Sequence, residues 1–155
     1  MKKLLAFLLC ILFPASVFAS GSGYKIDYDG GSLPNLKPGT SMRLVIEGTN
    51  IDVLKGKSSV AVIPASAVTE ISYGQDVHRR VGAAIGVGAV TLGLGALMAL
   101  TKSKKHYIGL LWNENGKKGG FAFQANKKDY RGLLAGLEGI TGKQAIDSDT
   151  MTVKN

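Results

Sequence analysis

The sequence has few of the residues from which catalytic and metal sites are usually built. It has 155 residues, with one Cys, two His and one Trp. A single Cys excludes an intramolecular disulfide and a zinc site made of several thiolates. His78 and His106 belong to no H-x-x-x-H or H-E-x-x-H spacing, the pattern typical of zinc hydrolases. We therefore predict no catalytic residue, no metal site and no cofactor, in a protein that is not an enzyme.

Acidic residues are also scarce, because 11 Asp and Glu face 19 Lys and Arg, which gives a net charge of +8. The basic residues concentrate between His78 and Arg131, where only Glu114 and Asp129 oppose them. Such an excess suits an anionic surface. Nucleic acid is disfavoured, since aromatic residues are not interleaved with the basic ones. The sequence thus predicts a membrane lipid surface as partner, no nucleic acid, and no identifiable small-molecule ligand.

The N-terminus has the pattern of an export signal. Lys2 and Lys3 precede the apolar stretch 4–13, and Ala19 follows at a position that a signal peptidase reads. We predict a signal peptide over residues 1–19, whose removal would take away the only Cys, and a periplasmic or cell-envelope location. An uncleaved membrane anchor is the alternative, although the apolar stretch is short for a membrane span.

A second apolar stretch, Val81 to Leu100, contains no charged residue. As a helix it would be about 30 Å long, which matches the hydrocarbon core of a bilayer. Basic residues flank both ends, as is typical of membrane segments. We name residues 77–105 the apolar insert. We expect five basic residues to contact anionic headgroups, namely Arg79, Arg80, Lys102, Lys104 and Lys105.

Small residues recur in this insert at alternating steps of four and three, and so line one face of a helix. They are Gly82, Gly86, Ala89, Gly93 and Ala96. Such a face allows close approach of another helix, and we expect it to mediate contact with a membrane or with a like helix in a homo-oligomer. A buried core helix and an exposed loop are the alternatives; the first needs more covering chain than this length offers, and the second would expose many Val and Leu side chains.

The remaining sequence predicts mainly β structure with one amphipathic helix. Short runs rich in Val, Ile and Tyr, separated by Gly and Asn turns, favour an antiparallel meander. The predicted strands are 24–28, 42–47, 51–54, 60–63, 68–73, 107–112 and 121–124. Asn126 is the expected N-cap of a helix whose apolar face carries Leu133 and Leu137, and Gly142 is expected to end it.

This order of elements resembles the pleckstrin-homology-like fold, including its GRAM-type bacterial members. The resemblance rests on VAVIPASAVTEISYG and on YIGLLW…GGFAFQA…DYRGLLAGLEGI. It implies a seven-stranded antiparallel barrel closed by a C-terminal helix over residues 20–146, interrupted by the insert, with a flexible tail at 147–155. The family implies a binding platform without catalysis. Phosphoinositide binding is not implied here, because the early strands offer only Lys55 and Lys57.

The barrel and the insert constrain each other. If Tyr73 and Tyr107 lie on neighbouring antiparallel strands, the two ends of the insert must lie close together, whereas a straight transmembrane helix separates its ends by about 30 Å. We favour an insert that forms a helical hairpin, bent near 86–88 or 93–95, or that dips into one leaflet. The alternative is a true span, with the later strands forming a separate element beyond the membrane.

The sequence therefore predicts a non-enzymatic, exported, envelope-associated binding or scaffold module that contacts a membrane or a like helix through its glycine-rich insert. One alternative is a homo-oligomer that inserts into or perturbs membranes. A second alternative is a soluble secreted enzyme or inhibitor.

Overall fold

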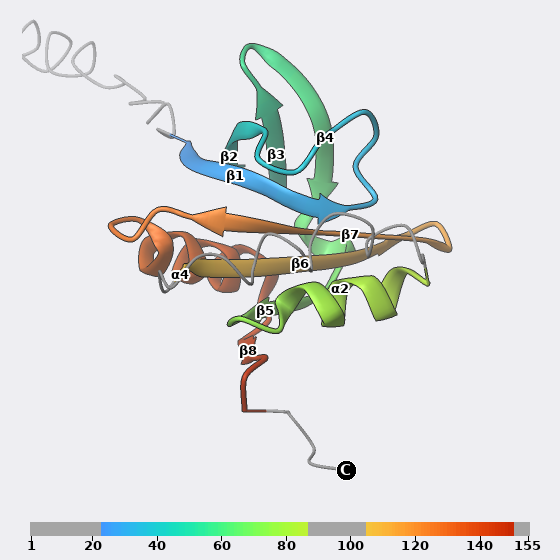
Figure 1. The fold of residues 1–155 in the computed structure, drawn as a ribbon. Helices are drawn as coiled ribbons and strands as arrows, with labels where there is room; N and C mark the ends of the chain where they lie inside the picture. Colours follow the sequence, from blue (N-terminus) through green and yellow to red (C-terminus); the bar gives the residue numbers. More distant parts are fainter. Residues whose placement is uncertain (1–22, 87–104, 151–155) are drawn as a thin grey trace, which may run out of the picture.

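The structure is a computed structural model, and it describes residues 23–86 and 105–150. These residues form one eight-stranded sheet, a 3-10 turn and two short α-helices (Figure 1). The strands are β1 (Tyr24–Gly31), β2 (Ser41–Glu47), β3 (Asn50–Lys55), β4 (Ser58–Pro64), β5 (Val68–Tyr73), β6 (His106–Glu114), β7 (Lys117–Ala125) and β8 (Ala145–Asp147). The helices are α2 (Val77–Ile85) and α4 (Tyr130–Thr141), and the 3-10 turn η2 covers Ala65–Ala67.

Each of the seven strands predicted from the sequence is present. In β3, Ile51 and Val53 are fully buried while the half-buried Asp52 between them lies on the opposite face, so alternation of polar and apolar residues fixes which face enters the core. Asn115 and Gly116 both have positive φ, as the tight turn between β6 and β7 requires.

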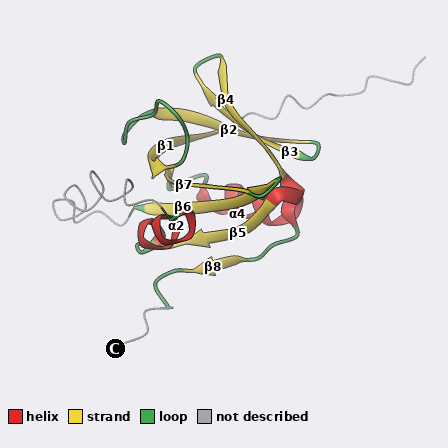
Figure 2. Cartoon of the chain, turned by 90° about the vertical axis from the view of Figure 1, so that its right-hand side faces the viewer, coloured by secondary structure: helices red, strands yellow, loops and turns green. Residues whose placement is uncertain are grey.

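β6 and β7 are buried on both faces, which explains why they read as nearly continuous apolar runs. Ile108 and Phe121 face the main core, where Leu133 of α4 also packs. Their neighbours Tyr107 and Ala122 face a second, smaller cluster under α2. The two helices therefore cover opposite faces of this part of the sheet, and Figure 2 shows α2 and α4 on its two sides.

The predicted seven-stranded antiparallel barrel closed by a C-terminal helix is wrong. The sheet is open, with the order β4-β3-β2-β1-β7-β6-β5-β8, and it is mixed, since β8 pairs with β5 in parallel. Closure would need a strand from the first half of the sheet on the free edge of β5, and β8 occupies that edge. α4 lies against β2, β5 and η2, so it fills the inner face of the open sheet.

α4 confirms the helix predicted after β7, with a shifted start. Leu133 and Leu137 are fully buried, and Gly142 ends the helix in the left-handed conformation with φ 68°. The N-cap is Asp129, not the expected Asn126, whose carbonyl instead accepts hydrogen bonds from the backbone N–H groups of Asp129 and Tyr130. A turn thus precedes the helix.

Candidate functional site

The two ends of the apolar insert meet at one place on the body. β5 and β6 are neighbouring antiparallel strands, with Tyr73 paired to Ile108. Just beyond them, the Gln75 side-chain amide donates a hydrogen bond to the Lys105 carbonyl at 2.7 Å. Because β6 and β7 belong to the same sheet as β1 and β5, the alternative that placed the later strands in a separate element is wrong.

The first part of the insert belongs to the folded body. In α2, Val77 and Val81 are fully buried against Tyr107, Leu111 and Ala122. Gly109 of β6 makes this approach possible, since a Cβ there would lie 2.7 Å from a methyl group of Val77. The helix ends at Gly86, which adopts φ 67°.

Polar contacts hold α2 at several points. The Arg80 guanidinium donates two hydrogen bonds to the Glu70 carboxylate, one of them 3.0 Å long from Nη2 to Oε2. This contact binds α2 to β5. From the C-terminal side, the Asp149 carboxylate accepts hydrogen bonds from the backbone N–H groups of Gln75 at 2.6 Å and of Asp76 at 3.2 Å, so it holds the residues that lead into the helix.

His78 is buried under α2 beside a carboxyl group of β1. Its Nδ1 lies 2.7 Å from Oδ2 of Asp29, although the two atoms are not aligned for a hydrogen bond. Tyr107 contacts the imidazole edge-on, at 4.7 Å between ring centres. Burial lowers the pKa of His78 and raises the pKa of Asp29, while His78 and Lys105 act on Asp29 in the opposite direction. Asp29 therefore lies near a titratable or charged side chain at each end of the insert, His78 and Lys105.

An aromatic cluster lies where the chain returns to the sheet. The rings of His106 and Tyr130 stack at 3.7 Å, and Tyr73 lies parallel to both. Nδ1 of His106 and the Tyr73 hydroxyl form a hydrogen bond of 2.8 Å. Burial lowers the pKa of His106, and the positive charges of Lys127 and Arg131 lower it further. This cluster joins β5, β6 and the first residue of α4.

The structure places only some of the residues that the sequence singled out. Arg80 pairs with Glu70 and does not extend into solvent, whereas Arg79 is exposed. Gly82 is half-buried and Gly86 exposed, with open space around its Cβ position. Several of these positions lie outside the described residues, namely 1–19, Ala89, Gly93, Ala96, Lys102 and Lys104.

The first residues of the expected flexible tail are part of the folded body. Residues 147–150 contact the body, where the Ser148 backbone N–H donates to the Tyr73 carbonyl at 2.8 Å. His78 and His106, to which the sequence assigns no catalytic or metal-binding role, are packed against tyrosines. Their apolar neighbours Val77 and Tyr107 were a usable signal, because each histidine adjoins a residue with core character.

Within residues 23–86 and 105–150, no helix is both long and apolar enough to cross a bilayer. The same ranges contain no group of three or more His, Cys, Asp or Glu side chains that could hold a metal ion. No model of a known protein family matches the chain, and no curated protein matches it.

Proposed function

We propose that the protein is an exported, envelope-associated scaffold that contacts a membrane through its apolar insert. The body fixes both ends of the insert at one place, and the insert carries the charge-free sequence between them. No enzymatic activity is part of this proposal.

One observation carries the proposal, which is the hydrogen bond between Gln75 and Lys105. It brings together the residues that precede and follow the insert, and from this place α2 runs along the sheet as far as Gly86. The body exposes little apolar surface of its own, since Val62 is the only large hydrophobic residue in the described ranges that is strongly exposed, at 53%. The apolar surface that needs cover is therefore that of the insert.

Vesicle flotation of the mature protein tests the proposal. The wild type should float with phosphatidylcholine vesicles, because apolar burial does not require anionic lipid. Replacing Leu94 and Leu97 by Asp should abolish flotation, since a charge is costly inside a bilayer. Mass spectrometry of the exported chain should find cleavage after Ala19.

The matched control places the same new charge on the body. Val62→Asp changes an exposed apolar residue of β4, which lies far from the insert in the order of the strands. It should float like the wild type. A wild type that stays with the soluble fraction at every lipid composition would refute membrane contact. An equal loss of flotation in the Leu94 and Leu97 variant and in Val62→Asp would refute it too.

Self-association through the glycine face is a second candidate. It is favoured by Gly82 and Gly86, which lie off the fully buried side of α2. Gly86 is unsuitable for a test, because its φ of 67° makes any larger residue strained. Replacing Gly82 by Ile should abolish crosslinked oligomers, and Ala84→Ile, on an exposed position of the same helix, should leave them unchanged.

A further inference from the structure

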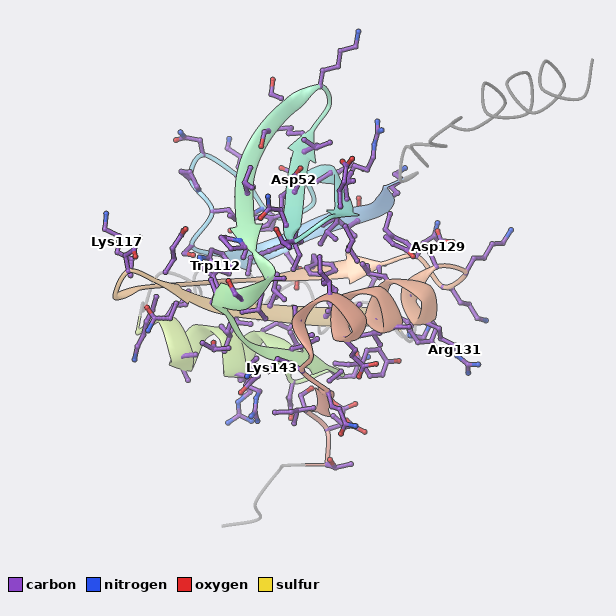
Figure 3. All side chains as sticks on the ribbon, turned by 180° about the vertical axis from the view of Figure 1, so that it is seen from behind. Asp52, Trp112, Lys117, Asp129, Arg131 and Lys143 are labelled. Atoms are coloured by element: carbon purple, nitrogen blue, oxygen red, sulfur yellow. The ribbon has the colours of Figure 1, made fainter. Side chains whose placement is uncertain are left out.

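Basic side chains gather around the aromatic cluster of Tyr73, His106 and Tyr130. This cluster adjoins the place where Gln75 contacts Lys105, which we call the base of the insert. Lys105 directly precedes His106, and His106 stacks on Tyr130, the first residue of α4. Lys127 and Arg131 lie close enough to depress the pKa of His106. Lys127, Lys128 and Arg131 are exposed, and Figure 3 shows Arg131 and Asp129 together at this end of α4.

Within residues 23–86 and 105–150, these cations form no ion pair. The ion pairs there join Arg80 to Glu70 and His78 to Asp29, not any of the four basic residues at this end. Asp129 is near in sequence but makes no ion pair with them. Asp149, which approaches Tyr73, is occupied with the backbone N–H groups of Gln75 and Asp76. The four cations are thus held in no ion pair, although Asp29 lies near Lys105 and Asp147 lies near Tyr73.

We propose that Lys105, Lys127, Lys128 and Arg131 form a docking surface for the anionic phosphates of a membrane, beside the point where the chain re-enters the body after the insert. Cations beside one end of the apolar insert would contact the headgroups of a bilayer while the insert contacts its hydrocarbon. This inference rests on the proposed function, and it adds three basic residues outside the insert to the contact. Each cation near an anionic surface strengthens binding roughly fivefold.

The chain offers a matched control for this surface. Lys117 and Lys118 are another exposed lysine pair, at the opposite end of β6 and β7, where α2 ends beside Gly120. Figure 3 shows Lys117 far from Arg131. Lys127→Gln with Lys128→Gln removes the same charge as Lys117→Gln with Lys118→Gln, so any difference between the two reports position and not net charge.

The test compares binding to vesicles of phosphatidylglycerol and of phosphatidylcholine. The variant at 127 and 128 should bind the anionic vesicles roughly thirtyfold less tightly than the wild type, and neutral vesicles equally well. The control variant should lose much less. Inorganic phosphate, added at constant ionic strength, should not displace the chain if the surface docks on a membrane and holds no single phosphate.

Two results would overturn the docking surface: equal losses in the two variants, or no loss in either. These results are separable from failure of the proposed function, which is measured with neutral vesicles and the Asp variants of Leu94 and Leu97. Binding to anionic vesicles alone, weakened only by the change at 127 and 128, would keep the docking surface and refute hydrocarbon contact by the insert. Circular dichroism confirms that each variant is folded.

Discussion

Gln75 and Lys105 are separated by 30 positions in the sequence and are joined by a hydrogen bond of 2.7 Å between side-chain amide and carbonyl. The Gly74 backbone N–H adds a second bond across the same base, to the Tyr107 carbonyl at 3.1 Å. The contacts that close the base thus lie entirely in the body.

Replacing residues 87–104 by a flexible linker should therefore leave the body folded. Ile85 lies beside Gly120, which pairs with Leu111, so the linker must return roughly 20 Å along β6 to Lys105. A Gly-Ser linker of about ten residues can span this distance. We expect a melting temperature within a few degrees of the wild type, measured by circular dichroism. A variant that cannot fold would mean that the insert contributes to the core.

Much of the fold was predictable from local pattern. Alternation identified the seven strands, and the spacing of Leu133 and Leu137 identified α4, because each element buries one regular face. β8 was missed because a strand of three residues carries no periodic signal. Its pairing with β5 also explains why closure into a barrel was wrongly expected, since the order of elements says nothing about which edge a short terminal strand occupies.

The base of the insert was only partly predictable. That β5 and β6 meet followed from the strand pattern, but the apolar insert read as one uniform segment. Val77 and Val81 instead complete the core of the body, and Gly86 ends the helix. Apolar residues that cover a sheet and apolar residues that enter a membrane look alike in sequence. Likewise, the stack of His106 on Tyr130 joins distant residues for which no local signal exists.

Two Gly→Ala changes should have opposite effects on stability. At Gly109, a Cβ would lie 2.5 Å from the Ser72 hydroxyl and 2.7 Å from Val77, so Gly109→Ala should push α2 from the sheet and cost about 1–3 kcal/mol. At Gly139, on an exposed position of α4, a Cβ meets nothing within 4 Å. Gly139→Ala should stabilise the protein by about 1 kcal/mol, because Ala favours the helix. Urea unfolding measures both, and equal effects would contradict the packing of α2.

Removing the C-terminal contacts should loosen α2. Truncation after Ile146 removes the hydrogen bonds from Asp149 to Gln75 and Asp76 and that of Ser148 to Tyr73, and should cost about 1–3 kcal/mol. Truncation after Thr150 keeps these bonds and is the matched control, with an expected change near zero. Faster amide exchange in residues 75–78, seen only in the shorter chain, would locate the effect. Identical stability of the two chains would show that the hydrogen bonds of Asp149 to Gln75 and Asp76 are dispensable.

Acidification should destabilise the protein through its two histidines. The pKa values of His78 and His106 are both below the ordinary value, chiefly because of burial. The unfolded chain therefore binds more protons than the folded chain just below pH 6.5, and stability falls as the pH drops through that value. Asp29 acts in the opposite sense, because its raised pKa favours the folded state at low pH.

His106→Phe isolates one of these contributions. Phenylalanine keeps a ring for stacking on Tyr130 and loses the hydrogen bond to Tyr73 at every pH, so the level of stability drops while its slope between pH 7.5 and 5.5 becomes flatter. NMR titration of His106 gives a direct second measurement. Its pKa should rise when Lys127 and Lys128 are both replaced by Gln, because Lys127 is one of the charges that lower it. The pair Lys117→Gln and Lys118→Gln should leave it unchanged, and a pKa that responds equally to both pairs would contradict the placement of Lys127 beside His106.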